Sequence, residues 1–222
     1  MVGSYLRYLW QRKSEYKIHS PFVFDFMKKV LYDHGSNRDY DLMLRISRLL
    51  DKKPMRNRWR RKQSRFLYRI VHYLEPDSVV SFGSLSAMDT SALALGNLQT
   101  KVHLEQSTDF LDTMNSMGIV NVSLIQPAEF DSERFKQLNT GLVIFGFDAF
   151  GDDNWDYLDD CLLHKTEDSV FLFEGIHRNR DIEEAWEQMK AREDVTLTMD
   201  IYSYGMVFFR EGIEKQDFVL KY

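Results

Sequence analysis

From residue 77 onward, short apolar runs alternate with amphipathic segments, and no other feature constrains the fold as strongly. The apolar runs predict strands at Ser78–Phe82, Lys101–Glu105, Asn121–Gln126, Gly141–Phe147 and Ser169–Glu174. The amphipathic segments predict helices at Asp89–Leu95, Ser107–Met117, Glu129–Leu138, Asn154–His164 and Asn179–Arg192. Strands that alternate with helices of this length form right-handed βαβ units, so we predict a parallel sheet covered by helices on both faces.

The end of the chain breaks this alternation. Val195–Ile201 and Tyr204–Arg210 are strand-like runs separated by two residues, which leaves no room for a helix. Neighbouring strands joined in this way are antiparallel. Gln216–Leu220 is a candidate for a further short strand. The whole pattern predicts a Rossmann-like α/β fold with a mostly parallel seven-stranded sheet and a C-terminal antiparallel hairpin.

Residues 1–75 form a separate, helical region in this interpretation, ahead of an α/β domain at 76–222. Ser20 is a good N-cap with Pro21 at the first helical position, and later helices are predicted at Tyr40–Leu50 and Ser64–Leu74. Aromatic residues are frequent in the first 30 positions, which predicts packing against either the core domain or a second subunit. The extension could therefore be a lid, a homodimer interface or both.

Charge is spread unevenly along the chain. The net charge is −5, yet the segment 52–65 carries eight Lys and Arg residues and no acid. This basic segment could be a solvated connection, a lid against the acidic body, or a nucleic-acid contact in which Trp59 stacks on a base. The single cysteine, Cys161, excludes an intramolecular disulfide, and no apolar run approaches the roughly 18–20 residues of a membrane span. With no signal-peptide pattern at the N-terminus, we expect a cytoplasmic protein without a membrane partner.

Ligands of open α/β sheets bind beyond the carboxyl ends of the strands. After the first strand, Gly83 lies in a loop of small residues that would let a ligand approach the backbone, although a lone glycine there is also an ordinary turn. Glu105 ends the second strand, 22 residues after Gly83. A carboxylate at this spacing commonly binds the two hydroxyls of a ribose, and its alternative role is to cap the following helix.

Two further strand ends carry ionisable residues. Asp148 follows the fourth strand and Glu174 ends the fifth, so these acids could bind a divalent cation or act as bases. His177 could be a general base. Alternatively, Glu174 and His177 could cap the following helix or pair with Arg178 or Arg180. The other histidines show no metal-ligand spacing.

Several segments resemble a known family. Val79–Gly96 resembles the cofactor loop and first helix of class I S-adenosylmethionine-dependent methyltransferases, closest to the small-molecule O-methyltransferases related to catechol O-methyltransferase. His19–Phe24, Phe171–Trp186 and Tyr204–Arg210 resemble blocks of a branch of bacterial, Bacteroidetes-type methyltransferase-like proteins. The resemblance covers most of the chain.

This resemblance implies S-adenosylmethionine as cofactor, held by Gly83, Ser84, Ser81, Glu105, Gln106, Ala128 and Phe147. It also places the catalytic candidates His177, Glu174 and Asp148 near the acceptor. The chain departs from the family pattern at the loop, where Ser81 replaces an acid and Ala87 a glycine, and at the metal site, where Gly146 stands in place of an aspartate. A hard cation needs several oxygen ligands, so we expect no metal.

The implied function is O-methyl transfer to a small molecule without a metal. A catalytically silent binding or scaffolding protein is the alternative that the departures suggest. A nucleic-acid methyltransferase or binder that uses the basic segment is a third hypothesis.

Overall fold

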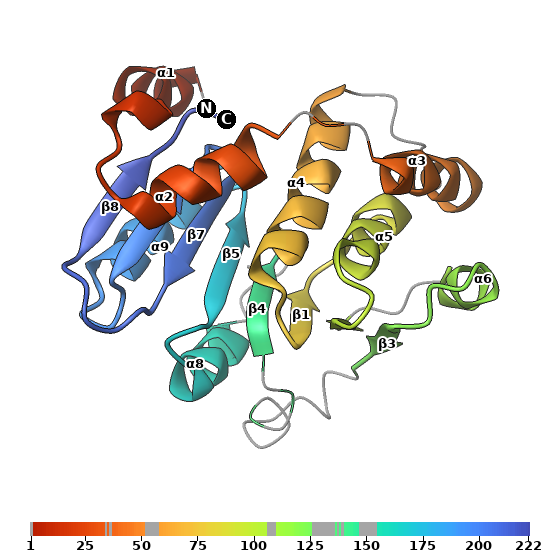
Figure 1. Ribbon diagram of the computed structural model, residues 1–222. Coiled ribbons are helices and arrows are strands. Elements are labelled where there is room, and N and C mark those ends of the chain that lie inside the picture. Colours follow the sequence, from red (N-terminus) through yellow and green to blue (C-terminus); the bar gives the residue numbers. More distant parts are fainter. Residues whose placement is uncertain are drawn as a thin grey trace.

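The computed structural model describes residues 2–33, 35, 37–51, 58–105, 110–125, 136, 138, 140–146 and 155–222. Its centre is one mixed sheet of strands β1 (Ser78–Phe82), β2 (Lys101–Leu104), β3 (Val122–Leu124), β4 (Thr140–Phe145), β5 (Val170–Glu174), β6 (Leu197–Asp200), β7 (Tyr204–Phe208) and β8 (Gln216–Val219). The strand order is β3-β2-β1-β4-β5-β7-β6-β8 (Figure 1). The predicted Rossmann-like α/β fold is confirmed.

The first five strands are mutually parallel, and β7 is antiparallel to both β5 and β6, as the two-residue connection required. The prediction of seven strands is wrong, because the described residues form eight. The added strand is β8, the candidate segment near the C-terminus, which pairs in parallel with β6 and so covers what would otherwise be the edge of the sheet.

The described helices are α1 (Val2–Gln11), the 3₁₀ turn η1 (Glu15–Lys17), α2 (Pro21–Phe26), the π-helical turn η2 (Met27–Leu31), α3 (Arg38–Leu50), α4 (Arg58–Leu74), α5 (Ala87–Gly96), α6 (Leu111–Ser116), α8 (Trp155–His164) and α9 (Arg180–Ala191). Ser20 caps α2 as predicted, since its hydroxyl accepts a hydrogen bond from the Val23 amide. The predicted helix at Glu129–Leu138 lies almost wholly outside the described residues. Within the described segments, none of the helices combines the length and apolar character that crossing a bilayer requires.

Helix α4 corrects the sequence prediction most clearly. It begins at Arg58 and not at Ser64, so the second half of the basic segment is helical. Arginine, lysine and glutamine are good helix formers, and the buried side chains of Gln63 and Ser64 fix this turn against the body of the protein. Lys52, Lys53 and Arg56 lie outside the described residues.

The sheet separates two hydrophobic cores, which makes the molecule a three-layer structure. Figure 1 shows α2, α4 and α5 across the near face of the sheet and α9 behind it. Along β4 the side chains alternate, so Leu142 and Ile144 join the core under α2–α5, while Val143 and Phe145 join the core with α8 and α9. Cys161 is buried in the second core.

The N-terminal helices pack on the α/β domain. The ring of Phe22 meets Phe208 of β7 edge to face, with centroids 5.5 Å apart. The Tyr8 hydroxyl of α1 donates to the Leu220 carbonyl at 2.6 Å, which holds the two ends of the chain together (Figure 1). Phe22 and Tyr8 therefore pack against the core domain, one of the two partners predicted for these aromatic residues. A homodimer through the N-terminal helices stays a prediction.

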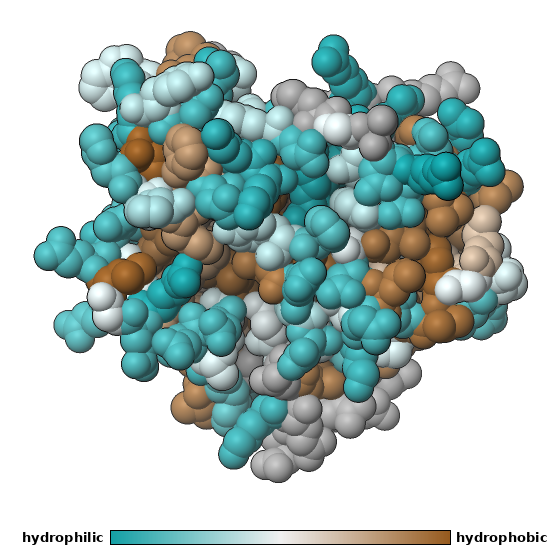
Figure 2. Space-filling view, in the orientation of Figure 1, coloured by the Kyte–Doolittle hydropathy of each residue, from teal (hydrophilic) through white to brown (hydrophobic). Residues whose placement is uncertain are grey.

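The surface in Figure 2 is mixed, with hydrophobic side chains gathered on the side where α3, α5 and α6 lie. Exposed apolar residues in or next to these helices are Leu49, Leu98, Met117 and Val120.

Candidate functional site

A cleft opens where the carboxyl ends of β1 and β5 face the start of α4. Its volume is about 470 Å³, within the usual range for small-molecule sites. Ser84 and Asp89 line it from the first βα connection, and Glu174 and His177 line it from the segment after β5. Of the four strand ends predicted to carry chemistry, those of β1 and β5 therefore meet in this cleft, whereas Glu105 is not in its lining and Asp148 lies outside the described residues.

Gly83 forms the turn that leaves β1. Its φ of +87° lies in the left-handed region, which favours glycine, so the turn itself requires this residue. The Gly83 amide donates a hydrogen bond of 2.9 Å to Oε2 of Glu105 at the end of β2. Two predicted cofactor residues are thus in direct contact, and the carboxylate is fixed beside the loop.

Ser81 and Ser84 lie on either side of this turn. Ser81 is fully buried in β1, and its hydroxyl has no hydrogen-bond partner among the described residues. Ser84 is exposed and lines the cleft. Of these two candidates, only Ser84 offers its side chain to the cleft.

Two acids at the start of α5, one on the helix and one from the end of α3, were not predicted from the sequence. The Ser86 hydroxyl caps the helix and donates to Oδ2 of Asp89 at 2.6 Å, while the Ser64 hydroxyl of α4 donates to Oδ1 of Asp89 at 2.6 Å. Asp51, just beyond α3, accepts a hydrogen bond of 2.7 Å from the Ala87 amide. Burial raises the pKa of Asp89, and the two serine hydroxyls act against that shift. The pattern Ser86-x-x-Asp89 is a capping-box signature that could have identified Asp89 from sequence.

His177 follows β5 and is held by two carboxylates. Its Nε2 lies 2.7 Å from Oδ2 of Asp200 and its Nδ1 lies 3.2 Å from Oε1 of Glu183. Both carboxylates accept hydrogen bonds when ionised, so this arrangement suits an imidazolium with a proton on each nitrogen. Burial favours the neutral ring, but the hydrogen bonds and charges of Asp200 and Glu183 outweigh it and raise the pKa of His177 above 6.5.

His177 and Arg180 each pair with other residues and not with one another. Arg180 pairs with Glu184 at 2.7 Å, and His177 pairs with the acids named above. The ring of His177 also stacks on Tyr202, with centroids 5.3 Å apart. With both nitrogens engaged, His177 fixes the segment after β5 in place, and its role in catalysis stays a prediction, as does that of Glu174.

The remaining candidates are Asp148, Gln106, Ala128 and Phe147, and all lie outside the described residues. Gly146, at the end of β4, is buried and donates its amide to the Phe82 carbonyl at 2.9 Å. Across the part of the chain that the structure describes, no group of three metal-ligating side chains converges.

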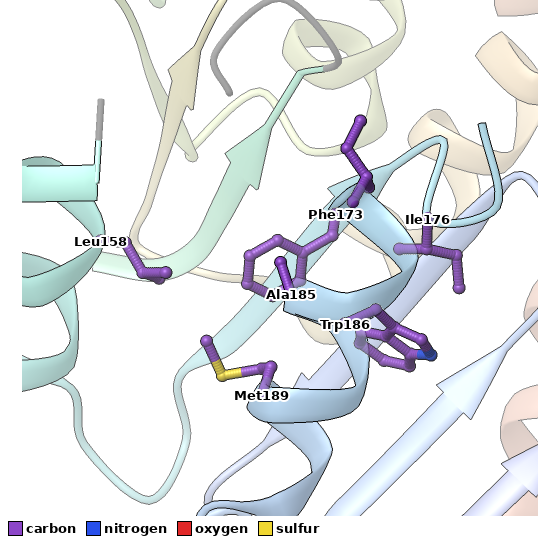
Figure 3. Close-up of a pocket in the computed structure, with 7 residues that line it drawn as sticks. Leu158, Phe173, Ile176, Ala185, Trp186 and Met189 are labelled. Atoms are coloured by element: carbon purple, nitrogen blue, oxygen red, sulfur yellow. The ribbon is translucent and has the colours of Figure 1, made fainter. Parts of the chain in front are cut away.

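A second, apolar cavity lies between α8, β5 and α9 (Figure 3). Leu158, Phe173, Trp186 and Met189 surround it, and its volume is about 20 Å³. This is room for little more than one water molecule, and an apolar lining does not hold water. We regard it as a packing gap and not as a ligand site.

The helical part of the basic segment contacts the protein itself. Nζ of Lys62 lies 3.6 Å from the centre of the Tyr222 ring, and the Arg65 guanidinium lies 4.7 Å from the Tyr40 ring. Arg60 and Gln63 form one wall of the cleft. Residues 58–65 are therefore part of the folded body, beside the candidate site.

The sequence matches no protein-family model and no curated protein. Solved structures do share its fold. An SAH-bound methyltransferase from Podospora anserina has 12% identity and a TM-score of 0.58, covering 87% of this chain and 98% of its own. A methyltransferase from Geobacter sulfurreducens has 13% identity and a TM-score of 0.56, covering 86% and 97%. An O-methyltransferase from Bacillus cereus in complex with SAH has 15% identity and a TM-score of 0.52, covering 84% and 96%.

Proposed function

We propose that this protein is an S-adenosylmethionine-dependent methyltransferase that transfers a methyl group to an oxygen atom of a small molecule without a bound metal. The observation that carries the proposal is the hydrogen bond between Gly83 and Glu105 across the ends of β1 and β2, directly before Ser84, which lines a cleft of suitable size. Similarity of fold to an SAH-bound methyltransferase and to an O-methyltransferase in complex with SAH supports the choice of cofactor.

The residues present fit this cofactor. Oε2 of Glu105 is used by the Gly83 amide, and among the described residues no hydrogen bond occupies Oε1, which is left for a ribose hydroxyl. The amino-acid end of the cofactor carries an ammonium group, and Ser81 cannot supply the carboxylate expected there. We assign that role to Asp89, which lines the cleft from the first turn of α5 and whose carboxylate is oriented by Ser64 and Ser86.

The reaction is an in-line displacement in which an acceptor oxygen bonds to the methyl carbon as the bond from sulfur to that carbon breaks. The cofactor supplies the activated methyl group, and the protein holds the two reactants in line. The acceptor proton must go to a base, for which Glu174 is placed in the cleft. His177 acts by fixing the segment that carries Glu174, and Asp148 stays a second candidate base.

Calorimetric titration of the cofactor-stripped protein with S-adenosylmethionine and SAH tests this proposal. We expect micromolar binding of both, followed by release of SAH when a suitable hydroxylated acceptor is present. Absence of binding at millimolar cofactor would contradict the proposal and favour the silent scaffold that the Ser81 and Ala87 departures suggest. Salt-dependent RNA binding that disappears on neutralising Arg58, Arg60 and Arg61 would instead favour the nucleic-acid alternative.

A further inference from the structure

A larger cavity lies on α4 away from the cleft. Its volume is about 760 Å³, and it is bounded by η2, the start of α3 and the second half of α4. It shares no lining residue with the cleft at the strand ends. A ligand here would not occupy the cofactor or acceptor position.

Arg69 is the notable residue of this cavity. Its side chain is 6% exposed, and its Nη1 donates to the Asp33 carbonyl at 2.8 Å while Nη2 donates to the Tyr222 hydroxyl at 3.3 Å. Its Nε has no hydrogen-bond partner among the described residues, and within those residues no carboxylate pairs with the guanidinium. A buried charge without a counter-ion is costly, so an anion is the group that this site lacks.

The charged residues around the cavity favour the same ligand. Lys28 and Lys29 line it from η2, and its acids are Asp33 and Glu75. Nζ of Lys29 also forms an ion pair of 3.0 Å with Asp25, which a phosphate would have to share. Oδ1 of Asp33 accepts a hydrogen bond of 2.7 Å from the Gly35 amide, so this carboxylate is already bonded within its own loop. His72 also lines the cavity, with Nδ1 on the Gly96 carbonyl at 3.2 Å.

Neutral hydrogen-bonding groups complete the lining. Tyr68 and Asn37 lie in the wall, where the Asn37 amide donates to the Tyr68 hydroxyl at 2.7 Å. The lysines belong to a π-helical turn, a rare element that is frequent at functional sites. The cavity therefore combines a buried arginine, two rim lysines and polar groups over a volume typical of small-molecule sites.

We propose that this cavity binds a small phosphate monoester, with the phosphate on Arg69, Lys28 and Lys29. Phosphate presents several acceptor oxygens and about two negative charges, which suits three cations from two elements better than a single carboxylate would. The cavity is much larger than a bare ion, so the ester group occupies the remaining space. The proposal does not depend on methyl transfer.

Phenyl phosphate is the probe, titrated calorimetrically into the full chain at constant ionic strength, with phenol as the uncharged comparison. We expect phenyl phosphate to bind and phenol not to bind. Arg69→Gln should weaken binding at least about tenfold, as loss of a charged hydrogen-bonding partner does. Arg48→Gln, which removes an equal charge from an exposed site on α3, should leave the affinity unchanged.

Circular dichroism checks that Arg69→Gln is folded. The double variant Lys28→Gln/Lys29→Gln alters only exposed residues. It tests phosphate binding in the cavity even if Arg69→Gln is not folded. We expect it to weaken binding several-fold. No binding of phenyl phosphate at millimolar concentration, equal affinity in the wild type and the double variant, or displacement of the probe by SAH would each overturn the proposal.

Discussion

Replacement of Glu105 tests one observed and one proposed task of this carboxylate. Oε2 accepts the Gly83 amide at 2.9 Å, and we propose that Oε1 binds a ribose hydroxyl. Glu105→Ala removes both. Glu105→Gln keeps an acceptor for the Gly83 amide but removes the negative charge, so it is the matched control.

The expected magnitudes follow from these contacts. Loss of a hydrogen bond to a charged group costs about 1.5–3 kcal/mol, which corresponds to about 10- to 150-fold weaker binding of SAH. Gly83 is buried, so its unpaired amide should also lower the free energy of unfolding of Glu105→Ala by about 1–3 kcal/mol. Glu105→Gln should lose affinity while keeping most of that stability.

Calorimetry with SAH gives the affinity, and urea denaturation gives the free energy of unfolding. Adenine, which has no ribose, should bind wild type and both variants equally. Unchanged SAH affinity in folded Glu105→Ala would refute the ribose assignment. Equal loss of SAH and adenine binding would instead show that the loop had collapsed.

Asp89→Asn should weaken SAH binding at least about fivefold, because a charged contact to the ammonium is lost, but should leave methylthioadenosine, which lacks the amino-acid end, unaffected in calorimetry. His177 has a raised pKa in the folded state, so its stabilising contribution is complete below the unfolded value of 6.5 and is lost as pH rises through the folded pKa. The difference in Tm between wild type and His177→Gln should therefore be larger at pH 6 than at pH 9, and a constant difference would contradict the assigned contacts. Gly205→Ala should destabilise the protein by about 1–3 kcal/mol by denaturant titration, because its Cβ would lie 2.7 Å from Cζ3 of Trp186, whereas Gly3→Ala meets nothing within 4 Å and should be neutral.

Sequence patterns predicted the strands well because each buried strand needs an apolar run. The β1 strand has the predicted bounds, Ser78–Phe82, and β5 differs only by one residue at its start. Helix α4 was predicted too short because residues 58–62 carry no apolar periodicity. Their helix is fixed by tertiary contacts such as the hydrogen bond from Ser64 to Asp89, which no local pattern contains.

The residues of the candidate site also differ in whether a local sequence pattern could identify them. Gly83 and Glu105, which the structure brings into contact, could be selected from the sequence because a strand end and a fixed spacing define them. The partners of His177 were not found, because Asp200 lies 23 positions later on β6 and only the fold brings it near. Asp51 lies 36 positions before Ala87, so its contact was equally invisible.

The contacts of Asp51 and Ser64 change how the N-terminal extension should be understood. The amide groups at the start of α5 would bind an anion if they were open, yet the extension supplies a carboxylate to one of them and a hydroxyl to Asp89. The loop between β1 and α5 is therefore anchored by Asp51 after α3 and, through Asp89, by Ser64 of α4, as well as by its own strand.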